Sequence, residues 1–252
     1  MVANGSGDHI PAFLLTNTSN VAILAHITVT PNTAAGCLGE AKIITITVDP
    51  TATVTVPADQ EKCNGAQSDL ITFTGTVAGT TYSWSNDNPA IGLAANGSGD
   101  HITAFMLTNT SNVAILAHIT VTPNTAAGCP GEAKTITITV DPTANVTVSA
   151  DQEKCNGAQS DPMTFTGTVA GTTYSWSNDN TAIGLAANGS GDHIPAFMLT
   201  NTGNVAILAH ITVTPNTPAG CPGEAKIITI TVDPTATVAV PADQEKCNHN
   251  CS

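Results

Sequence analysis

The sequence has few charged residues, few aromatic side chains and no arginine. Charged residues make up 10% of the 252 positions and aromatic residues 4%. The basic residues number six, all of them lysine, against nineteen carboxylates, and the formal net charge is −13. Phosphate binding needs a basic face, and arginine is the usual reader of base edges, so we expect no nucleic-acid partner. A surface of this charge favours solubility and repels polyanions.

Long hydrophobic runs are also missing. No segment approaches the roughly 20 apolar residues that cross a bilayer, so we expect no membrane insertion. The first residues, MVANGSGD, lack the basic and apolar regions of a signal peptide. If the protein is exported, we expect its signal to lie upstream or to have been removed.

What the sequence does contain is typical of an all-β protein. Hydrophobic residues make up 41% of the chain, enough to build cores. Threonine, valine and isoleucine alternate, and glycine, asparagine and proline cluster between the alternating segments. That pattern predicts sheets joined by tight turns, and no long amphipathic helix interrupts it.

The chain repeats itself with a period of 92 residues. The string ANGSGDHI begins at residues 3, 95 and 187, and two sets of cysteines keep the same spacing. Solenoid repeats run to roughly 20–50 residues, so this period instead suits an autonomous domain of about 100. A duplicated enzyme needs only one intact active site, whereas a spacer gains length only from faithful copies. The near-identity of the repeats therefore favours a mechanical or multivalent role.

One full period is expected to hold about seven strands. We predict them over residues 51–56, 70–77, 80–85, 91–94, 102–107, 113–122 and 134–140, with turns at 78–79 and 96–99. Seven short strands with Trp84 on the third predict an immunoglobulin-like β-sandwich. The tyrosine that usually precedes the last strand pair is missing.

The motifs within the period support a closer resemblance. The segment FTGTVAGTTYSWSNDNPAIGLAANGSGDHI, followed by ITVTPNTAAGC, TITITVDPTA and DQEKCNG, resembles the PKD-like or immunoglobulin-like repeats of long Bacteroidetes cell-surface proteins. The resemblance covers essentially the whole chain. It implies tandem sandwich modules, secretion through the type IX system and display on the outer surface, in proteins associated with gliding motility and adhesion.

The Asp-Pro-Thr linkers set the expected domain boundaries. They divide the chain into a C-terminal half-module (1–50), two complete modules (51–142 and 143–234) and the first strand of a following module (235–252). Below, module 1 denotes residues 51–142 and module 2 denotes residues 143–234.

Seven cysteines predict disulfides formed in an oxidising compartment. Two pairing schemes fit the period. Module-internal bonds would join Cys63 to Cys129 and Cys155 to Cys221. Bonds between successive modules would instead join Cys37 to Cys63, Cys129 to Cys155 and Cys221 to Cys247. We favour the module-internal scheme, because a linker is the simpler interpretation of Asp-Pro-Thr. The close pair Cys247 and Cys251 is a weak zinc signal, since no other repeat contains it.

Calcium is the one cofactor with some support in the sequence. Asp87, Asp100, Asp179 and Asp192 lie in loops rich in asparagine and glycine, and such loops can supply the oxygen ligands that calcium prefers. Aspartate and asparagine are also ordinary turn residues. His26, His118 and His210 lie in an alternating strand at positions expected to face solvent. No nucleophile–histidine arrangement and no phosphate-binding loop is defined, so we expect no enzymatic activity.

Two functions follow from these expectations. The first is an extracellular structural stalk or filament. Residues 235–252 of one copy either complete the N-terminal half-module of the next, which gives head-to-tail assembly, or are simply where a longer array was cut. The alternative is an adhesin that binds surface glycans or proteins through its sandwich loops. Glycan binding usually relies on exposed aromatic residues, and the chain has only two tryptophans and two tyrosines.

Overall fold

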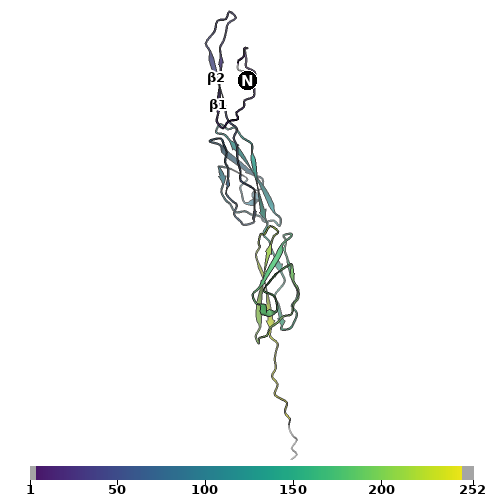
Figure 1. The fold of residues 1–252 in the computed structure, drawn as a ribbon. Helices are drawn as coiled ribbons and strands as arrows, with labels where there is room; N and C mark the ends of the chain where they lie inside the picture. The colour runs from purple at the N-terminus through teal and green to yellow at the C-terminus, as the bar shows by residue number, and fades with distance from the viewer. Residues whose placement is uncertain (1–3, 246–252) are drawn as a thin grey trace, which may run out of the picture. The chain divides into compact units, whose positions relative to one another are not determined.

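The computed structural model describes residues 4–245 and shows an all-β chain with two short 3₁₀-helices. The chain divides into two units between Pro142 and Thr143, and each unit has its own sheets and core (Figure 1).

The main sheet of module 1 has five strands. They are β3 (Gln60–Cys63), β9 (Lys134–Asp141), β8 (Ile115–Asn124), β5 (Thr81–Asn86) and β6 (Asn96–Ser98), in that spatial order. The β8–β9 hairpin is antiparallel, with Ala117 opposite Ile138. Strand β3 joins the other side of β9 in parallel, with Gln60 opposite the same Ile138. Two long strands thus form the centre of the sheet.

The opposing layer is built from shorter pieces. Strand β4 (Ile71–Thr72) pairs antiparallel with β7 (His101–Ile102). A single bridge joins Thr55 to Thr74, so only one pair marks the strand expected over residues 51–56.

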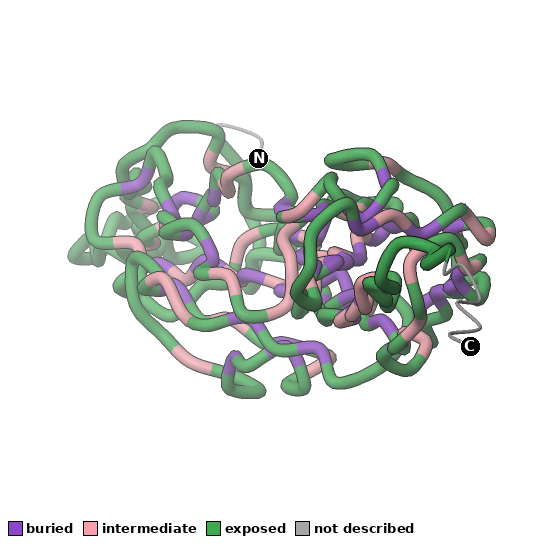
Figure 2. Tube along the Cα trace, turned by 90° about the horizontal axis from the view of Figure 1, so that it is seen from below, coloured by how far each residue is buried: buried purple, intermediate pink, exposed green. Residues whose placement is uncertain are grey.

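The core of module 1 lies between these layers. Alternate residues of β8 and β9 are fully buried, namely Ala117, Ile119, Val121, Ile136, Ile138 and Val140. They belong to one cluster with Ile71, Phe73 and Leu107 from the opposing side. Buried positions alternate with less buried ones along β8 and β9, and Figure 2 shows short buried stretches interleaved with exposed ones. The all-β sandwich expected from the alternating pattern is therefore confirmed.

Module 2 repeats this architecture. Its main sheet contains β11 (Gln152–Cys155), β17 (Lys226–Asp233), β16 (Ile207–Asn216), β13 (Thr173–Asn178) and β14 (Asn188–Ser190), in that order. Its second sheet contains β10 (Thr147–Val148), β12 (Met163–Thr166) and β15 (His193–Ile194). Gln152 pairs with Ile230, which is the register of module 1 moved by one repeat.

The N-terminal segment holds one hairpin, formed by β1 (Ile23–Val29) and β2 (Lys42–Val48). Ala25 pairs with Ile46, so the hairpin has the register of β8 and β9. Its apolar face is largely uncovered, because Ile44 is 47% exposed whereas the equivalent Ile136 is fully buried.

The strand expected over residues 91–94 is wrong, because the segment begins with a 3₁₀-helix, η1 (Pro89–Ile91). The Asn88 side chain accepts a hydrogen bond from the backbone N–H of Ala90, and proline is well suited to a first helical position. Gly92, at φ +97°, ends the turn in a conformation that glycine adopts most readily. Module 2 has the same turn, η2 (Thr181–Ile183).

The turn expected over residues 96–99 is also wrong in part. Residues 96–98 form β6, and Gly97 lies opposite Trp84 of β5. A Cβ at Gly97 would come within 2.3 Å of the Trp84 ring, so glycine lets the indole lie against the strand. Strand β3 is a further addition, since no strand was expected over residues 60–63.

Candidate functional sites of the module

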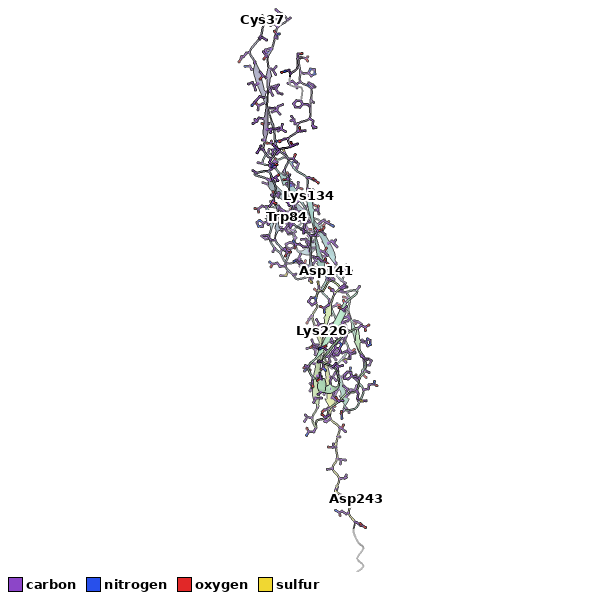
Figure 3. The ribbon with its side chains drawn as sticks, viewed as in Figure 1. Cys37, Trp84, Lys134, Asp141, Lys226 and Asp243 are labelled. Carbon is purple, nitrogen blue, oxygen red and sulfur yellow. The ribbon has the colours of Figure 1, made fainter. Side chains whose placement is uncertain are left out.

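The repeated cysteines lie at opposite ends of each module. Cys63 ends β3 and pairs with Asp141, the last residue of β9. Cys129 lies in the turn that joins β8 to β9, between Asn124 and Pro130, which form an isolated bridge. In Figure 3, Lys134 at the start of β9 lies toward one end of module 1 and Asp141 lies at the other. The ten residues of β8 between these ends span about 30 Å.

This placement corrects the favoured disulfide scheme. Cys37, Cys129 and Cys155 have free thiols, whereas Cys63 and Cys221 are disulfide-bonded. The pairs Cys63–Cys129 and Cys155–Cys221 are therefore not formed, because a disulfide requires Cα atoms within about 7 Å of each other. The alternative pairs Cys37–Cys63 and Cys129–Cys155 are not formed either. Cys247 lies outside the described residues.

The bonded and free cysteines have equivalent backbone surroundings. The Cys221 N–H donates to Thr217 Oγ1 at 3.0 Å, and the Cys129 N–H donates to Thr125 Oγ1 at 3.1 Å. Cys221 is nevertheless only 1% exposed, whereas Cys129 is exposed. The turn alone therefore does not bury this cysteine.

Two of the loop carboxylates expected to bind calcium hold a neighbouring strand. In module 1, Asp87 Oδ1 accepts a hydrogen bond from the His118 backbone N–H at 2.7 Å, and its Oδ2 lies 2.8 Å from His118 Nδ1. These bonds lower the pKa of Asp87, the backbone bond most strongly. Asp179 and His210 repeat the arrangement in module 2. His118 and His210 lie on the exposed side of the strand, as expected.

The other two carboxylates pair with the histidine that follows them. Asp100 Oδ1 lies 2.6 Å from His101 Nδ1, and Asp192 Oδ1 lies 2.7 Å from His193 Nδ1. The hydrogen bond from the ring lowers the pKa of each carboxyl group. Across residues 4–245, no three histidine, cysteine, aspartate or glutamate side chains gather as a metal site. Calcium binding by Asp87, Asp100, Asp179 and Asp192 stays a prediction.

Buried asparagines tie loops to strands within each module. Asn109 is 3% exposed, and its side-chain amide donates to the carbonyls of Val113 at 2.8 Å and Val140 at 2.7 Å. Its Oδ1 accepts from the backbone N–H of Ser111 at 2.9 Å. Asn109 thereby ties the loop before β8 to the end of β9. Asn201 makes the same bonds in module 2.

Among the carboxyl groups of residues 4–245 whose pKa is shifted, Asp141 alone has a raised pKa. Burial is the main cause, and the nearby charge of Glu61 adds to it. Asp141 ends β9 beside Cys63, so this end of module 1 combines a partly desolvated acid with a bonded cysteine.

The N-terminal segment carries an open apolar groove of about 320 Å³. Its lining comes from the loop before β1 and from the exposed face of the hairpin, and comprises Ile10, Pro11, Ala12, Phe13, Leu15, Ile27, Ile44 and Ile46. The residues equivalent to Ile44 and Ile46 in module 1, Ile136 and Ile138, are core residues.

Among the described residues, none of the helices has the length and apolar character needed to cross a membrane.

The fold and the repeated register define a tandem array of immunoglobulin-like β-sandwiches. The PKD-like domain family matches the chain twice, over residues 57–144 and 152–236. The chain therefore belongs to the PKD-like domain family. No curated protein matches the sequence.

Solved structures of other multidomain β-proteins resemble the chain only distantly. Extracellular domains 3–5 of Drosophila OTK share 13% identity, with a TM-score of 0.43, over 78% of this chain and 69% of that one. The D00–D0 domain of intimin shares 12% identity, with a TM-score of 0.37, over 70% of this chain and 98% of that one. The extracellular cadherin domains 3–6 of protocadherin gamma B2 share 9%, with a TM-score of 0.35, and this chain spans 56% of that one and 77% of its own length.

Proposed function

We propose that the protein is a structural component of an extracellular stalk or filament, without catalytic activity. The observation that carries this proposal is the near-identity of modules 1 and 2, which share their sheet order, register and buried core positions. The polar side chains of the loops support the same interpretation, because Asp87 and Asn109 bond to strands of their own module. A spacer protein requires faithful copies of a domain that folds by itself.

An extracellular location is supported by cysteine chemistry. Cys63 and Cys221 are disulfide-bonded, and such bonds persist mainly in oxidising compartments. Membership of the PKD-like family and the resemblance to Bacteroidetes surface repeats support export through the type IX system and display on the cell surface.

Assembly is proposed to occur head to tail between copies of this chain. In module 1, residues 51–63 supply the buried Ala52 and Val54 and the parallel strand β3. Residues 235–245 repeat the sequence of residues 51–61 with one difference, Ala239 in place of Thr55. The uncovered hairpin β1–β2 has the register of the strands that this segment meets in module 1. Strand addition of this kind would supply main-chain hydrogen bonds and bury alternate side chains.

Deleting residues 235–252 tests the assembly mode. Sedimentation and negative-stain images of the intact chain should show polymers that the deleted chain does not form. Polymers of unchanged length and yield after the deletion would contradict strand addition, and would leave the structural role to be tested separately.

A glycan array combined with negative-stain microscopy tests the structural role itself. We expect extended particles and no glycan bound above background. Saturable binding to a defined glycan, abolished by substitutions in the sandwich loops, would favour the adhesin instead.

A further inference from the structure

The main sheet of module 2 joins an early strand of the module directly to its last strand. Strand β11 pairs with β17 in parallel, and at the end of the pair Cys155 lies opposite Asp233. Upstream of this pair, β10 is joined to β12 by only two register positions, and that pairing is antiparallel. The β11–β17 pair is therefore the main connection between the two terminal parts of the module.

The chain enters and leaves module 2 at opposite ends of this pair. Near the entry, the Ala144 carbonyl oxygen occupies the place that a Cβ at Gly223 would need, so the entering chain lies against the turn before β17. The exit follows Asp233, the last residue of β17. The eight residues of β17 therefore lie between the entry and the exit.

A pull on the two ends of the module loads β11 and β17 in shear. Tension draws β11 toward its N-terminal end and β17 toward its C-terminal end, and these directions are opposite because the strands are parallel. The hydrogen bonds of a parallel pair are evenly spaced along the strands, so they carry the load together. In an antiparallel pair, both pulls would act at the same end and the bonds would open one after another.

Further hydrogen bonds extend the connection beyond both ends of β11. Asp151 Oδ1 accepts from the Thr229 backbone N–H at 2.7 Å, which ties the residue before β11 to the middle of β17. At the other end, the Asn156 N–H donates to the Asp233 carbonyl at 2.8 Å. Cys155 has a free thiol, so no disulfide adds to this connection. The two strands are thus held together by hydrogen bonds from residue 151 to residue 156.

Strand β11 is also fixed to the rest of module 2. The Asp161 N–H donates to Gln152 Oε1 at 2.8 Å, and Lys154 Nζ lies 3.1 Å from Asp161 Oδ2. The Asn201 N–H donates to Asn156 Oδ1 at 2.8 Å. These contacts oppose any sliding of β11 along β17.

We propose that the parallel pair β11–β17, with the bonds of Asp151 and Asn156, is a mechanical clamp that keeps module 2 folded under tension along the chain. The inference rests on the proposed role as a stalk, because a stalk attached at both ends carries tension. Module 1 has the same parallel pair, β3 with β9, and Asp59 Oδ1 accepts from the Thr137 N–H at 2.8 Å. Modules 1 and 2 each contain a clamp of this kind.

Single-molecule force spectroscopy of the intact chain, held through peptide tags at its two ends, tests the clamp. A reductant in the buffer opens the disulfides at Cys63 and Cys221, so that the strand pairs bear the tension. Modules 1 and 2 should unfold in separate steps that each lengthen the chain by about 280 Å. This length follows because a period of 92 residues extends to about 320 Å and a folded module spans about 35–40 Å.

Asp151→Ala removes the side-chain bond between the two loaded strands of module 2. At a given force, one of the two unfolding steps should become about 5- to 10-fold faster. The reason is that a bond already broken in the transition state acts fully on the unfolding rate, which governs forced unfolding. The other step comes from the unaltered module 1, keeps its rate and serves as a reference in the same molecule.

Asp179→Ala is the matched control. Asp179 Oδ1 also accepts a backbone N–H at 2.7 Å, that of His210, but this bond joins the loop after β13 to β16 and remains formed when the clamp opens. The control should lower the urea midpoint of module 2 at least as much as Asp151→Ala and leave both forced-unfolding rates unchanged. Equal acceleration in the two variants, or none in Asp151→Ala, would overturn the clamp. Either result would leave the stalk role itself to be decided by scattering and microscopy.

Discussion

At the scale of single residues, the contact between Gly97 and Trp84 shows how little space the fold leaves beside its indole. A Cβ on Gly97 would meet two ring atoms of Trp84 at 2.3 and 2.6 Å, and Gly189 with Trp176 repeats the contact. The sequence contains a sign of this contact, since both residues recur in each full period. Glycine beside serine favours a turn, however, and the pairing of β6 with β5 depends on the tertiary fold.

Replacing Gly97 with alanine should therefore destabilise module 1. Overpacking of this kind costs about 1–3 kcal/mol, because the ring or the strand must shift. Each complete module contains one tryptophan, so Trp84 fluorescence in a Trp176→Phe background reports urea unfolding of module 1 alone. Ser98→Ala, an exposed position on the same strand, is the control, and equal midpoints for the two variants would contradict the packing argument.

Replacing Asn109 is expected to destabilise module 1, although asparagine is a polar residue. Asn109→Ala removes the amide donor of the buried Val140 carbonyl, whereas the Val113 carbonyl keeps its hydrogen bond from Ser111 Oγ. One unpaired buried polar group costs about 1–3 kcal/mol, so we expect a loss of about that size in the free energy of unfolding. The same fluorescence assay measures it, with the exposed Thr110→Ala as the matched control. A loss no greater than that of the control would show that the loop before β8 does not depend on this amide.

The carboxyl groups of module 1 predict opposite responses to pH. Burial and Glu61 raise the pKa of Asp141, so the stability it contributes is complete below its unfolded pKa and is lost as pH rises through the folded value. Hydrogen bonds from His118 lower the pKa of Asp87, so its contribution is present above the unfolded pKa and is lost as pH falls through the folded value.

Two variants separate these contributions. Asp141→Asn should raise the Tm of module 1 at pH 7 and leave it unchanged at pH 3. Asp87→Asn should lower the Tm at pH 7, with the difference shrinking as the pH is lowered. Calorimetry between pH 3 and pH 7 checks both, and shifts of the same sign at pH 7 would contradict the assignment.

At the scale of strands, the sequence predicts long elements better than short ones. The strands expected over 113–122 and 134–140 correspond to β8 and β9, because seven or more alternating residues define one buried face. Strand β3 was missed because the four residues QEKC carry no alternation, and their pairing depends on an exposed edge of β9 that exists only in the folded sheet.

Asp59 is expected to hold this edge strand in place. Its Oδ1 accepts a hydrogen bond from the Thr137 backbone N–H at 2.8 Å, which joins the start of β3 to the middle of β9. Asp59→Ala should increase hydrogen exchange of the β3 amides by about 5- to 10-fold, because local opening becomes easier by about 1 kcal/mol, while β8 keeps its protection. Glu132→Ala, which removes an exposed carboxylate that pairs with Lys134, is the control. Unchanged exchange in β3 of the Asp59→Ala chain would show that the parallel pairing is independent of Asp59.

At the scale of the whole molecule, the number of modules and the fold class can be predicted from the sequence, because the same strand pattern recurs every 92 residues. The boundaries at 51–142 and 143–234 stay a prediction. The disulfide scheme was wrong because spacing along the chain does not reveal that Cys63 and Cys129 lie at opposite ends of one sandwich. Only the sheet topology shows at which end of the sandwich each cysteine lies, and that position decides which cysteines can form a disulfide.

The central proposal is that this chain acts as a spacer whose length grows with each module, and small-angle scattering of the intact chain tests it most directly. A compact protein of 252 residues would have a radius of gyration of about 18 Å. Two sandwiches in line, each about 35–40 Å long, should instead give a radius of gyration of about 25 Å or more and a maximum dimension of at least about 80 Å. A value near 18 Å for the monomer would contradict the account, because a stalk cannot be built from modules that fold back on one another.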